Sequence, residues 1–341
     1  MRVMRHGIFG RITAGLALAL ATWGAAVAPA QAREANFEVA FDSALGTELR
    51  APRDYTPSFD NPLMQRVALL ADGGQGRIGV AALDLSTGQQ IGILGDQRFP
   101  MASTSKIAIA ATFLEGVDQG RWSLDDRFPL MVPVRSAAFS TAVAPVRAGD
   151  RLAARELIDL MITRSSNPAT DALLAVVGGV DPVNDWARRA GIQEFTLSRD
   201  IATLVRDDGE INPATSIDIR DSATPQAMVE MLAGLYQGQW LTQASRNVLI
   251  GAMERTVTGK RRIPAMMPGG VTVAHKTGSL NNTSSDIGII TLPDGRSIAL
   301  AIYVTGQGTR LNREAKIASI ARAIHDGYAE QEARQWVNAR Y

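Results

Sequence analysis

The chain of 341 residues contains no cysteine and only three histidines, His6, His275 and His325. Without cysteine it can form no disulfide bond, and it cannot carry a lipid on an amino-terminal cysteine. Zinc sites are built mainly from cysteine and histidine side chains. We therefore expect no metal, no cofactor and no catalytic histidine.

Lysine is also scarce. Only Lys106, Lys260, Lys276 and Lys316 occur, and arginine supplies the other 31 of the 35 basic residues. Arginine keeps its proton at any working pH, whereas a lysine that is removed from water can lose its proton. Two of the four lysines fall inside the short motifs described below, which indicates that an amine is needed at those positions.

Residues 1–32 have the pattern of a secretory signal peptide. Three arginines, Arg2, Arg5 and Arg11, precede an apolar run over residues 12–28. Ala30-Gln31-Ala32 after this run matches a cleavage site. The run is short for a membrane-spanning helix and ends at Pro29. We expect a cleaved signal, a periplasmic or secreted protein, and no stable membrane anchor.

The mature chain carries little net charge. The whole chain has a formal charge of +1, and residues 1–32 hold three arginines and no acid, so the mature charge is −2. This balance does not favour nucleic acid or an anionic membrane as a partner. We expect a monomer that acts on a small molecule.

Hydrophobic periodicity predicts a helix, two strands, a long helical stretch, three strands and a final helix. The first helix is predicted over residues 61–71 and the first strands over 77–85 and 90–94. Further predicted helices span 106–117, 154–162, 168–177, 225–235, 243–253 and 313–328, and further strands span 271–275, 286–292 and 297–305.

This order predicts an α/β plus all-α fold. An antiparallel five-stranded sheet would be flanked by the N- and C-terminal helices and would carry an inserted all-helical domain. After an extended lead-in over 33–58, we expect residues 59–103 and 263–341 to form the α/β domain. Residues 104–262 would form the all-helical domain.

Three short motifs follow one another: Ser103-Thr104-Ser105-Lys106, Ser165-Ser166-Asn167 and Lys276-Thr277-Gly278-Ser279. Each alone also fits a structural role, as a capped helix with an exposed lysine, a capping turn, or an edge strand with a protective lysine. In this order and this context of helix and strand, they predict a serine acyl-transfer site.

Ser103 and Lys106 form the reactive pair of this prediction. Pro100 places Ser103 in the first turn of a helix, and Lys106, three residues later, shares a helix face with it. The segment after Lys106 is apolar all round, so we expect the helix to be buried. Burial lowers the pKa of a lysine, which lets Lys106 accept the Ser103 proton.

The middle motif supplies a hydroxyl and an amide to the same cleft. Ser165 can relay a proton to a leaving nitrogen, and Asn167 can hold a substrate carbonyl. The alternative is a capping turn before Pro168.

The third motif follows the strand predicted over 271–275. Lys276 and Thr277 offer a cation and a hydroxyl to a substrate carboxylate. Gly278 lets a ligand approach the backbone, and the Ser279 N–H can complete an oxyanion hole with the N–H of the predicted nucleophile.

At these residues the chain resembles the penicillin-recognising serine enzymes, above all the class A β-lactamases. The likeness runs from about residue 60 to residue 325 and includes the sequences around the motifs. These are Arg98-Phe99-Pro100-Met101-Ala102, Arg155-Glu156-Leu157, Asp218-x-Arg220-Asp221-x-x-Thr224-Pro225 and Asp286-Ile287.

The resemblance implies Ser103 as the acylated nucleophile, Lys106 as the proton acceptor and Ser165 as the proton relay. It also implies that Asn167 contacts the amide of the substrate side chain and that Lys-Thr-Gly-Ser binds the carboxylate. An arginine often supports this carboxylate in the family, and the candidates are Arg310 and Arg313.

Two features depart from the class A pattern. The middle motif is Ser-Ser-Asn, as in penicillin-binding proteins, where class A usually has aspartate in the centre. Class A enzymes also carry Glu-x-x-Leu-Asn in the loop before Asp-x-Arg-Asp, and its glutamate activates the water that frees the acyl-enzyme. That sequence does not occur in this chain.

Two alignments of this loop are open. Counting back from Asp221 places Asp208 at the glutamate and Asn212 at the asparagine, with Glu210 as a second candidate base. Counting forward from Gly191 places Ile201 at the glutamate. We expect the backward count to hold, because Asn212 and the residues around it then match together.

We therefore expect a serine β-lactamase that hydrolyses β-lactam antibiotics through a Ser103 acyl-enzyme. The first alternative is a penicillin-binding DD-peptidase that acts on peptidoglycan stem peptides. It uses the same acylation groups but has no base for deacylation of β-lactams. The second is a binding or sensor module that is acylated once.

Overall fold

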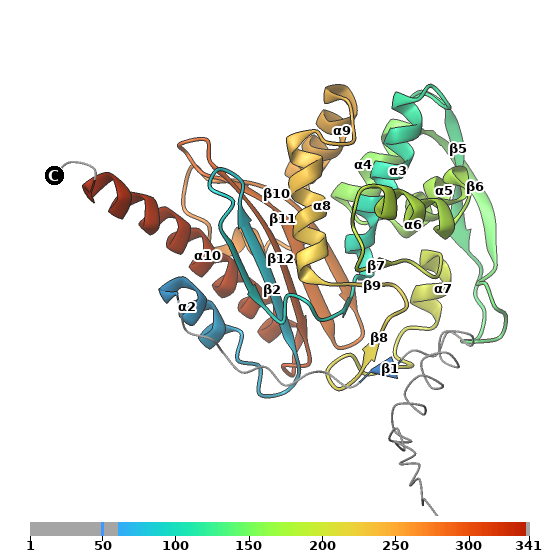
Figure 1. Cartoon of the computed structure of the whole chain (residues 1–341). Coiled ribbons are helices and arrows are strands. Elements are labelled where there is room, and N and C mark those ends of the chain that lie inside the picture. Colours follow the sequence, from blue (N-terminus) through green and yellow to red (C-terminus); the bar gives the residue numbers. More distant parts are fainter. Residues whose placement is uncertain (1–48, 51–60, 339–341) are drawn as a thin grey trace, which may run out of the picture. The chain divides into compact units, whose positions relative to one another are not determined.

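An antiparallel sheet of five strands forms the centre of the described structure (Figure 1). In spatial order the strands are β10 (Thr272–Leu280), β11 (Thr283–Thr291), β12 (Ser297–Thr305), β2 (Ile78–Asp84) and β3 (Gln90–Ile93). The computed structural model describes residues 49–50 and 61–338. The predicted signal peptide and, except for residues 49–50, the predicted lead-in lie outside the described residues.

Strand β12 is buried on both faces. The even-numbered residues of 298–304 pack with α2 (Pro62–Leu70) and α10 (Arg310–Asn338) on one face. The odd-numbered residues of 299–303 pack with the helical layer on the other. Because alternate side chains of a strand point to opposite faces, this strand has to be apolar along its whole length.

Helix α8 covers the face of the sheet opposite α2 and α10 (Figure 1). The helices between β4 (Phe99–Pro100) and β10 pack with α8 in one helical layer. The helices of this layer are α3 (Lys106–Asp118), α4 (Ala154–Thr163), α5 (Asn167–Val177), α6 (Val180–Arg189), α7 (Ile201–Arg206), α8 (Pro225–Gln237) and α9 (Gln243–Glu254). Ten of the 13 residues of α3 are buried. A helix that is apolar all round has to lie inside the helical layer, and this position takes its first residue, Lys106, out of water.

The predicted fold class is confirmed: the structure has the antiparallel five-stranded sheet with helices at both chain ends and a helical region between. The sequence analysis misses the hairpin of β5 (Arg127–Pro133) and β6 (Val146–Ala153). No residue of either strand is fully buried, so the alternation that identifies a strand is absent. The predicted domain boundaries stay a prediction.

Short elements position the site residues between the sheet and the helical layer. Strand β4 (Phe99–Pro100) pairs with β9 (Ser222–Ala223), and β9 also pairs with β7 (Phe195–Thr196). Strand β1 (Leu49–Arg50) pairs with β8 (Ile217–Asp218). The 3₁₀ turn η2 (Ile263–Met266) precedes β10.

The prediction that a strand ends before Lys276 is wrong, because β10 continues to Leu280. Gly278 explains how the third motif fits inside a strand. A Cβ at this position would lie 2.7 Å from the Met101 carbonyl oxygen and 2.4 Å from Ser285 Oγ. Only glycine allows β10 to pass this close to the segment before Ser103.

Candidate active site

Lys106 forms the centre of the candidate site. It is the first residue of α3 and is fully buried. Its Nζ donates to the Ser165 carbonyl oxygen at 2.8 Å, to Ser165 Oγ at 3.3 Å and to Asn167 Oδ1 at 2.7 Å. The fold therefore brings the first two motifs into direct contact.

Ser103 lies one turn ahead of Lys106, in the 3₁₀ turn η1 (Ala102–Ser105). The α-helix itself begins at Lys106, whose N–H donates to the Ser103 carbonyl oxygen, so the predicted first turn that holds Ser103 is 3₁₀ and leads directly into the helix. Ser103 is half-buried, so a substrate can reach it. Ala102 before it has φ of 48°, a left-handed conformation that costs a non-glycine residue about 1–2 kcal/mol.

Ser165 joins the second and third motifs. Lys276 Nζ donates to its Oγ at 2.9 Å, as Lys106 Nζ does at 3.3 Å. A hydroxyl oxygen accepts two hydrogen bonds and donates one. With both amines donating, the hydrogen of the Ser165 hydroxyl is directed to a third atom, as a proton relay to a substrate requires.

The hydrogen bonds of both lysine amines go to neutral oxygens in the described structure. Burial lowers the pKa of Lys106 well below its ordinary value, and the charge of Lys276 lowers it further, while Asp171 opposes this. Burial lowers the pKa of Lys276 to about 7, against the opposing effect of Asp286. Lys276 therefore exchanges its proton near neutral pH, and burial favours the neutral form of the Lys106 amine.

The remaining residues of the third motif lie before and after Gly278 on β10. Thr277 Oγ1 hydrogen-bonds Thr258 Oγ1 at 2.8 Å, and Ser279 is exposed. The close approach of Gly278 to Met101 brings β10 beside η1. An oxyanion hole formed by the N–H groups of Ser103 and Ser279 requires this arrangement.

Arg262 is the arginine that contacts the third motif, and the sequence analysis missed it. Its guanidinium is 1% exposed and donates to the Gly278 carbonyl oxygen at 2.8 Å and to Ser279 Oγ at 2.7 Å. Arg262 and Arg310 both pair with Glu314, and Arg313 donates to backbone oxygens and to Ser284. Arg262 follows another arginine and a lysine in the chain, and nothing local distinguishes the buried one.

A buried carboxylate supports β10 from behind. Asp286 is fully buried, and its oxygens lie 2.9 and 3.0 Å from His275 Nδ1. Asp286 also accepts the Ile263 N–H at 3.1 Å. His275, the residue before Lys276, thus has a structural partner, Asp286, on the neighbouring strand of the sheet.

Similarity to known proteins agrees with this geometry. Residues 62–328 match the family model described as the β-lactamase enzyme family. Beta-lactamase CTX-M-8 of Citrobacter amalonaticus is 31% identical over 273 residues, which is 79% of this chain and 90% of the relative. The extended-spectrum beta-lactamase PER-1 of Pseudomonas aeruginosa is 27% identical over 285 residues, 80% of this chain and 89% of the relative.

Solved structures give the same result. A β-lactamase from Chitinophaga pinensis superposes with a TM-score of 0.69 at 28% identity and covers 79% of this chain and all of that one. A variant of the last common ancestor of Gram-negative class A β-lactamases has a TM-score of 0.69 at 34% identity, over 80% of this chain and all of that one. The chain belongs to the β-lactamase enzyme family. Within it, the resemblance is to class A.

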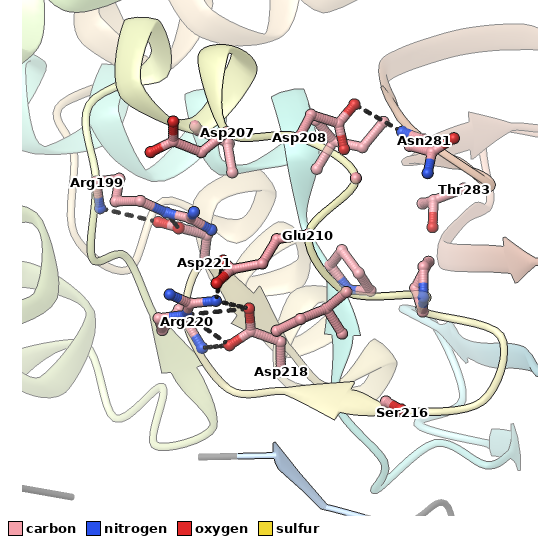
Figure 2. A pocket seen from close by; sticks show the side chains of 16 residues that line it. Arg199, Asp207, Asp208, Glu210, Ser216, Asp218, Arg220, Asp221, Asn281 and Thr283 are labelled. Carbon is pink, nitrogen blue, oxygen red and sulfur yellow. Dashed lines mark hydrogen bonds and ion pairs between the residues drawn. The ribbon is translucent and has the colours of Figure 1, made fainter. Parts of the chain in front are cut away.

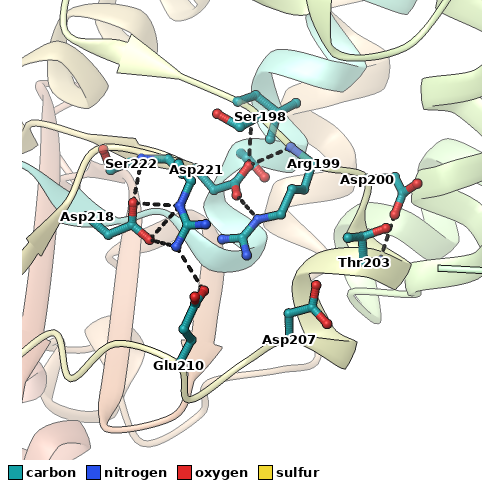
Figure 3. Close-up of polar contacts among 12 residues, drawn as sticks. Ser198, Arg199, Asp200, Thr203, Asp207, Glu210, Asp218, Asp221 and Ser222 are labelled. Atoms are coloured by element: carbon teal, nitrogen blue, oxygen red, sulfur yellow. Dashed lines mark hydrogen bonds and ion pairs between the residues drawn. The ribbon is translucent and has the colours of Figure 1, made fainter. Parts of the chain in front are cut away.

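The loop before α8 is where this class A relative differs from the family pattern. Asp221 accepts the N–H groups of Ser198 at 2.8 Å and Arg199 at 3.0 Å, and Arg199 Nε at 2.6 Å (Figure 3). Asp171, on α5, accepts the N–H groups of Ile201 and Ala202 at 2.8 and 2.9 Å. Residues 201–202 thus contact the helix that carries Asn167, which favours the forward count.

Asp208 (Figure 2) lies further along the loop, against the turn between β10 and β11, and Asn212 contacts the same turn. Asp208 Oδ2 accepts the Asn281 N–H at 2.8 Å, and Asn212 Oδ1 accepts from Asn282 Nδ2 at 2.9 Å. Glu210 pairs with Arg220. None of the hydrogen bonds described for Asp208 or Asn212 reaches Lys106, Ser165 or Lys276, so their roles in the site stay predictions.

Among the described residues, 49–50 and 61–338, no helix has the length and apolar character of a membrane span. They also contain no cluster of three or more histidine, aspartate or glutamate side chains arranged to hold a metal ion.

Proposed function

We propose that this protein hydrolyses β-lactams through an acyl-enzyme on Ser103. The observation that carries the proposal is that two buried lysine amines share the Ser165 hydroxyl. One of these lysines, Lys106, lies one turn after Ser103. This arrangement supplies a base, a relay and a cation to one small volume. The named activities of the relatives support the same reaction.

Acylation follows from these groups. Ser103 Oγ attacks the β-lactam carbonyl carbon and passes its proton to Lys106 Nζ. The carbonyl oxygen takes up the negative charge and is held by the N–H groups of Ser103 and Ser279. When the C–N bond breaks, the ring nitrogen takes the Ser165 hydroxyl proton, which Lys106 replaces. An ester on Ser103 and an opened ring result.

The substrate carboxylate has a defined place in this proposal. Lys276 and Thr277 offer a cation and a hydroxyl, and Arg262 adds positive charge behind Ser279. Asn167 Oδ1 is bonded to Lys106, which leaves the amide NH₂ of Asn167 to donate to the carbonyl of the substrate side chain.

Deacylation requires a water molecule and a base. The prediction for the base is Asp208, and Asn212 would help to hold the water. Asp208 is exposed, and desolvation raises its pKa while the Asn281 N–H lowers it. The buried loop residues Ile201 and Ala202 carry no carboxylate.

That absence favours a second candidate function, a penicillin-binding DD-peptidase that acts on peptidoglycan stem peptides. The Ser-Ser-Asn motif also supports it. A sensor that is acylated once is the remaining alternative. The signal-like residues 1–32 support export in each case, and we propose a monomer in the periplasm or outside the cell.

The deciding experiment is turnover of nitrocefin, a chromogenic β-lactam, by residues 33–341, with intact mass recorded during the reaction. A β-lactamase gives many turnovers per molecule and little adduct. A single burst with a lasting adduct on Ser103 contradicts β-lactam hydrolysis and supports the DD-peptidase, which would then release D-alanine from an acyl-D-alanyl-D-alanine peptide. The Ser103→Ala variant is the control for both readouts.

A further inference from the structure

Asp171 is a buried carboxylate on α5 that the proposed mechanism leaves without a role. It lies one turn after Asn167 on the same helix, and Asn167 Oδ1 accepts from Lys106 Nζ at 2.7 Å. Side chains four residues apart share a helix face, with about 5–6 Å between their Cβ atoms. Asp171 is only 6% exposed. The fold therefore places a carboxylate, removed from water, one helix turn from a hydrogen-bond partner of the predicted base.

Two backbone hydrogen bonds fix this carboxylate in place. Its Oδ1 accepts the Ile201 N–H at 2.8 Å, and its Oδ2 accepts the Ala202 N–H at 2.9 Å. Both donors belong to the first turn of α7, where backbone N–H groups have no partner within the helix. Because both donors are neutral amides, they hold the carboxylate without cancelling its negative charge.

The charges of Asp171 and Lys106 act on each other. Burial and the charge of Lys276 lower the pKa of Lys106, and the negative charge of Asp171 raises it. Burial raises the pKa of Asp171 to about 6, with a contribution from Asp200 and against its backbone hydrogen bonds and the charge of Lys106. Asp171 is therefore an anion at neutral pH. Its charge is weakly screened, because buried charges are shielded little by solvent and salt.

Acylation as proposed creates a positive charge at Lys106. The O–H bond of Ser103 breaks, and its proton forms a new N–H bond at Lys106 Nζ, so the amine becomes an ammonium. The hydrogen-bond acceptors described for this amine are neutral oxygens, and the charge of Lys276 repels the new cation. A buried cation is costly unless an opposite charge lies near it.

We propose that Asp171 is the counter-ion of Lys106, a positioning residue that stabilises the ammonium formed when Ser103 is acylated. It acts through space from the neighbouring turn of α5 and does not contact the substrate. The proposal rests on acyl transfer at Ser103, and it applies to hydrolase and DD-peptidase alike because both use this acylation step. The same carboxylate holds α7, so it also links the base to the loop before α8.

The small number of lysines makes a direct test possible. Lysine labelled with ¹³C at Cε gives one NMR signal for each of the four side chains, and its chemical shift reports the charge of the amine. The Lys106→Met variant identifies the Lys106 signal by its loss. A pH titration of the protein without substrate then gives the pKa of Lys106 directly.

Asp171→Asn removes the charge and keeps the shape of the side chain. A nearby opposite charge changes a pKa by roughly one to three units, so the pKa of Lys106 should fall by about one unit or more. Lys276 is an internal reference in the same spectrum. Its pKa should change far less, because the charges that act on it are those of Asp286 and Arg262.

Asp200→Asn is the matched control. Asp200 is the N-cap of α7, and its Oδ1 accepts the Thr203 N–H at 2.7 Å (Figure 3). Asparagine caps a helix as well as aspartate does, so this variant removes a negative charge from the same loop and keeps its hydrogen bond. The pKa of Lys106 should change far less than in Asp171→Asn.

The pH profile of acylation separates the effect of charge from the anchoring of the loop. Intact mass, recorded at early times, gives the rate at which a β-lactam acylates Ser103, and this rate rises with pH as Lys106 loses its proton. In Asp171→Asn the rise should move to lower pH by the shift seen in the NMR titration, and the plateau should fall several-fold because the base is weaker. A purely structural role would lower the plateau and leave the rise in place, which would contradict the proposal.

The titration alone can also overturn the proposal. It does so if the pKa of Lys106 is the same in Asp171→Asn as in the native protein, or if the Lys106 amine stays neutral in both at every pH at which they are folded. An equal shift in Asp200→Asn would show that any acid of this loop has the effect. If no β-lactam acylates Ser103, the proposed hydrolysis fails, while the titration still decides whether Asp171 is the counter-ion of Lys106.

Discussion

The lysines of the active site and the arginines of the neighbouring loop hold positive charge in opposite ways. Lys106 and Lys276 are fully buried, and the hydrogen-bond acceptors described for them are neutral oxygens. Arg199 and Arg220 keep 18% and 25% of their side chains exposed and bond directly to carboxylates. The two regions lie in one fold and differ in burial and in counter-ion.

In the proposed mechanism this difference separates lysines that take part in proton transfer from arginines that hold structure. A guanidinium keeps its charge in either setting, so arginine paired with a carboxylate acts as a fixed clamp. An amine without a carboxylate partner in a dry site gives up its proton readily. This chain has only four lysines, and two of them are buried with their amines on the Ser165 hydroxyl.

The largest effect should come from removing the proposed nucleophile. Ser103→Ala should lower β-lactam turnover by roughly 10⁴-fold or more, because no acyl-enzyme can form. Nitrocefin assays and intact mass measure this directly. The variant should have the same Tm as the native protein. A β-lactam adduct that still forms on this variant would contradict the assignment of Ser103 as the nucleophile.

Exchanging lysine for arginine tests the comparison at each amine separately. Lys106→Arg keeps the charge but cannot act as a base, so turnover should fall roughly 10²- to 10⁴-fold. Lys276→Arg keeps a cation for the substrate carboxylate, and its loss should be much smaller. Equal losses in kcat/KM for the two variants would show that the amines have the same role.

Breaking the arginine clamp should affect stability more than chemistry. Asp221→Asn leaves Arg199 without its buried partner and should lower the free energy of unfolding by about 3–5 kcal/mol. Each kcal/mol corresponds to a fall in Tm of about 2 °C or less for a chain of this size. Calorimetry on Asp221→Asn, with the less buried Asp218→Asn for comparison, measures the difference.

The pH dependence should report the pKa of Lys276. Its charge is lost as pH rises through about 7, so kcat/KM for carboxylate-bearing β-lactams should fall up to tenfold per pH unit above that value. For stability the sign is opposite. The unfolded chain binds the extra proton between pH 7 and 10.5, so this group makes unfolding more costly as pH rises across that window. Lys276→Arg should remove both trends.

The smallest effect should come from an arginine pair at the surface. Arg255 and Asp159 are 62% and 47% exposed and lie 2.9 Å apart. Arg255→Gln should change the free energy of unfolding by less than about 1 kcal/mol and leave turnover unchanged. A larger loss in a urea titration would mean that exposed pairs also hold this fold together.

The sequence predicts the fold class because its apolar segments have clear periods, as in α3 and in β12, whose bounds the prediction matches. It predicts the contacts among Lys106, Ser165 and Lys276 because the three motifs that contain them are together typical of a serine acyl-transfer site. It could not identify Arg262, since its burial depends on Glu314 and on strand backbone far away in the chain. Nor could it align the loop, because the contacts of Asp221 with Ser198 and Arg199 join residues more than 20 positions apart.

The order of strands in the sheet has a consequence for how this protein is made. Strand β2 pairs with β12, which is synthesised only after the whole helical region. Until residue 305 emerges, the hairpin of β2 and β3 has an open edge that can pair with other chains. During synthesis from the N-terminus, the five-stranded sheet therefore cannot form until β12 has been made. Chains truncated before β12 should aggregate. A chaperone that delays folding would benefit this topology more than one that accelerates it.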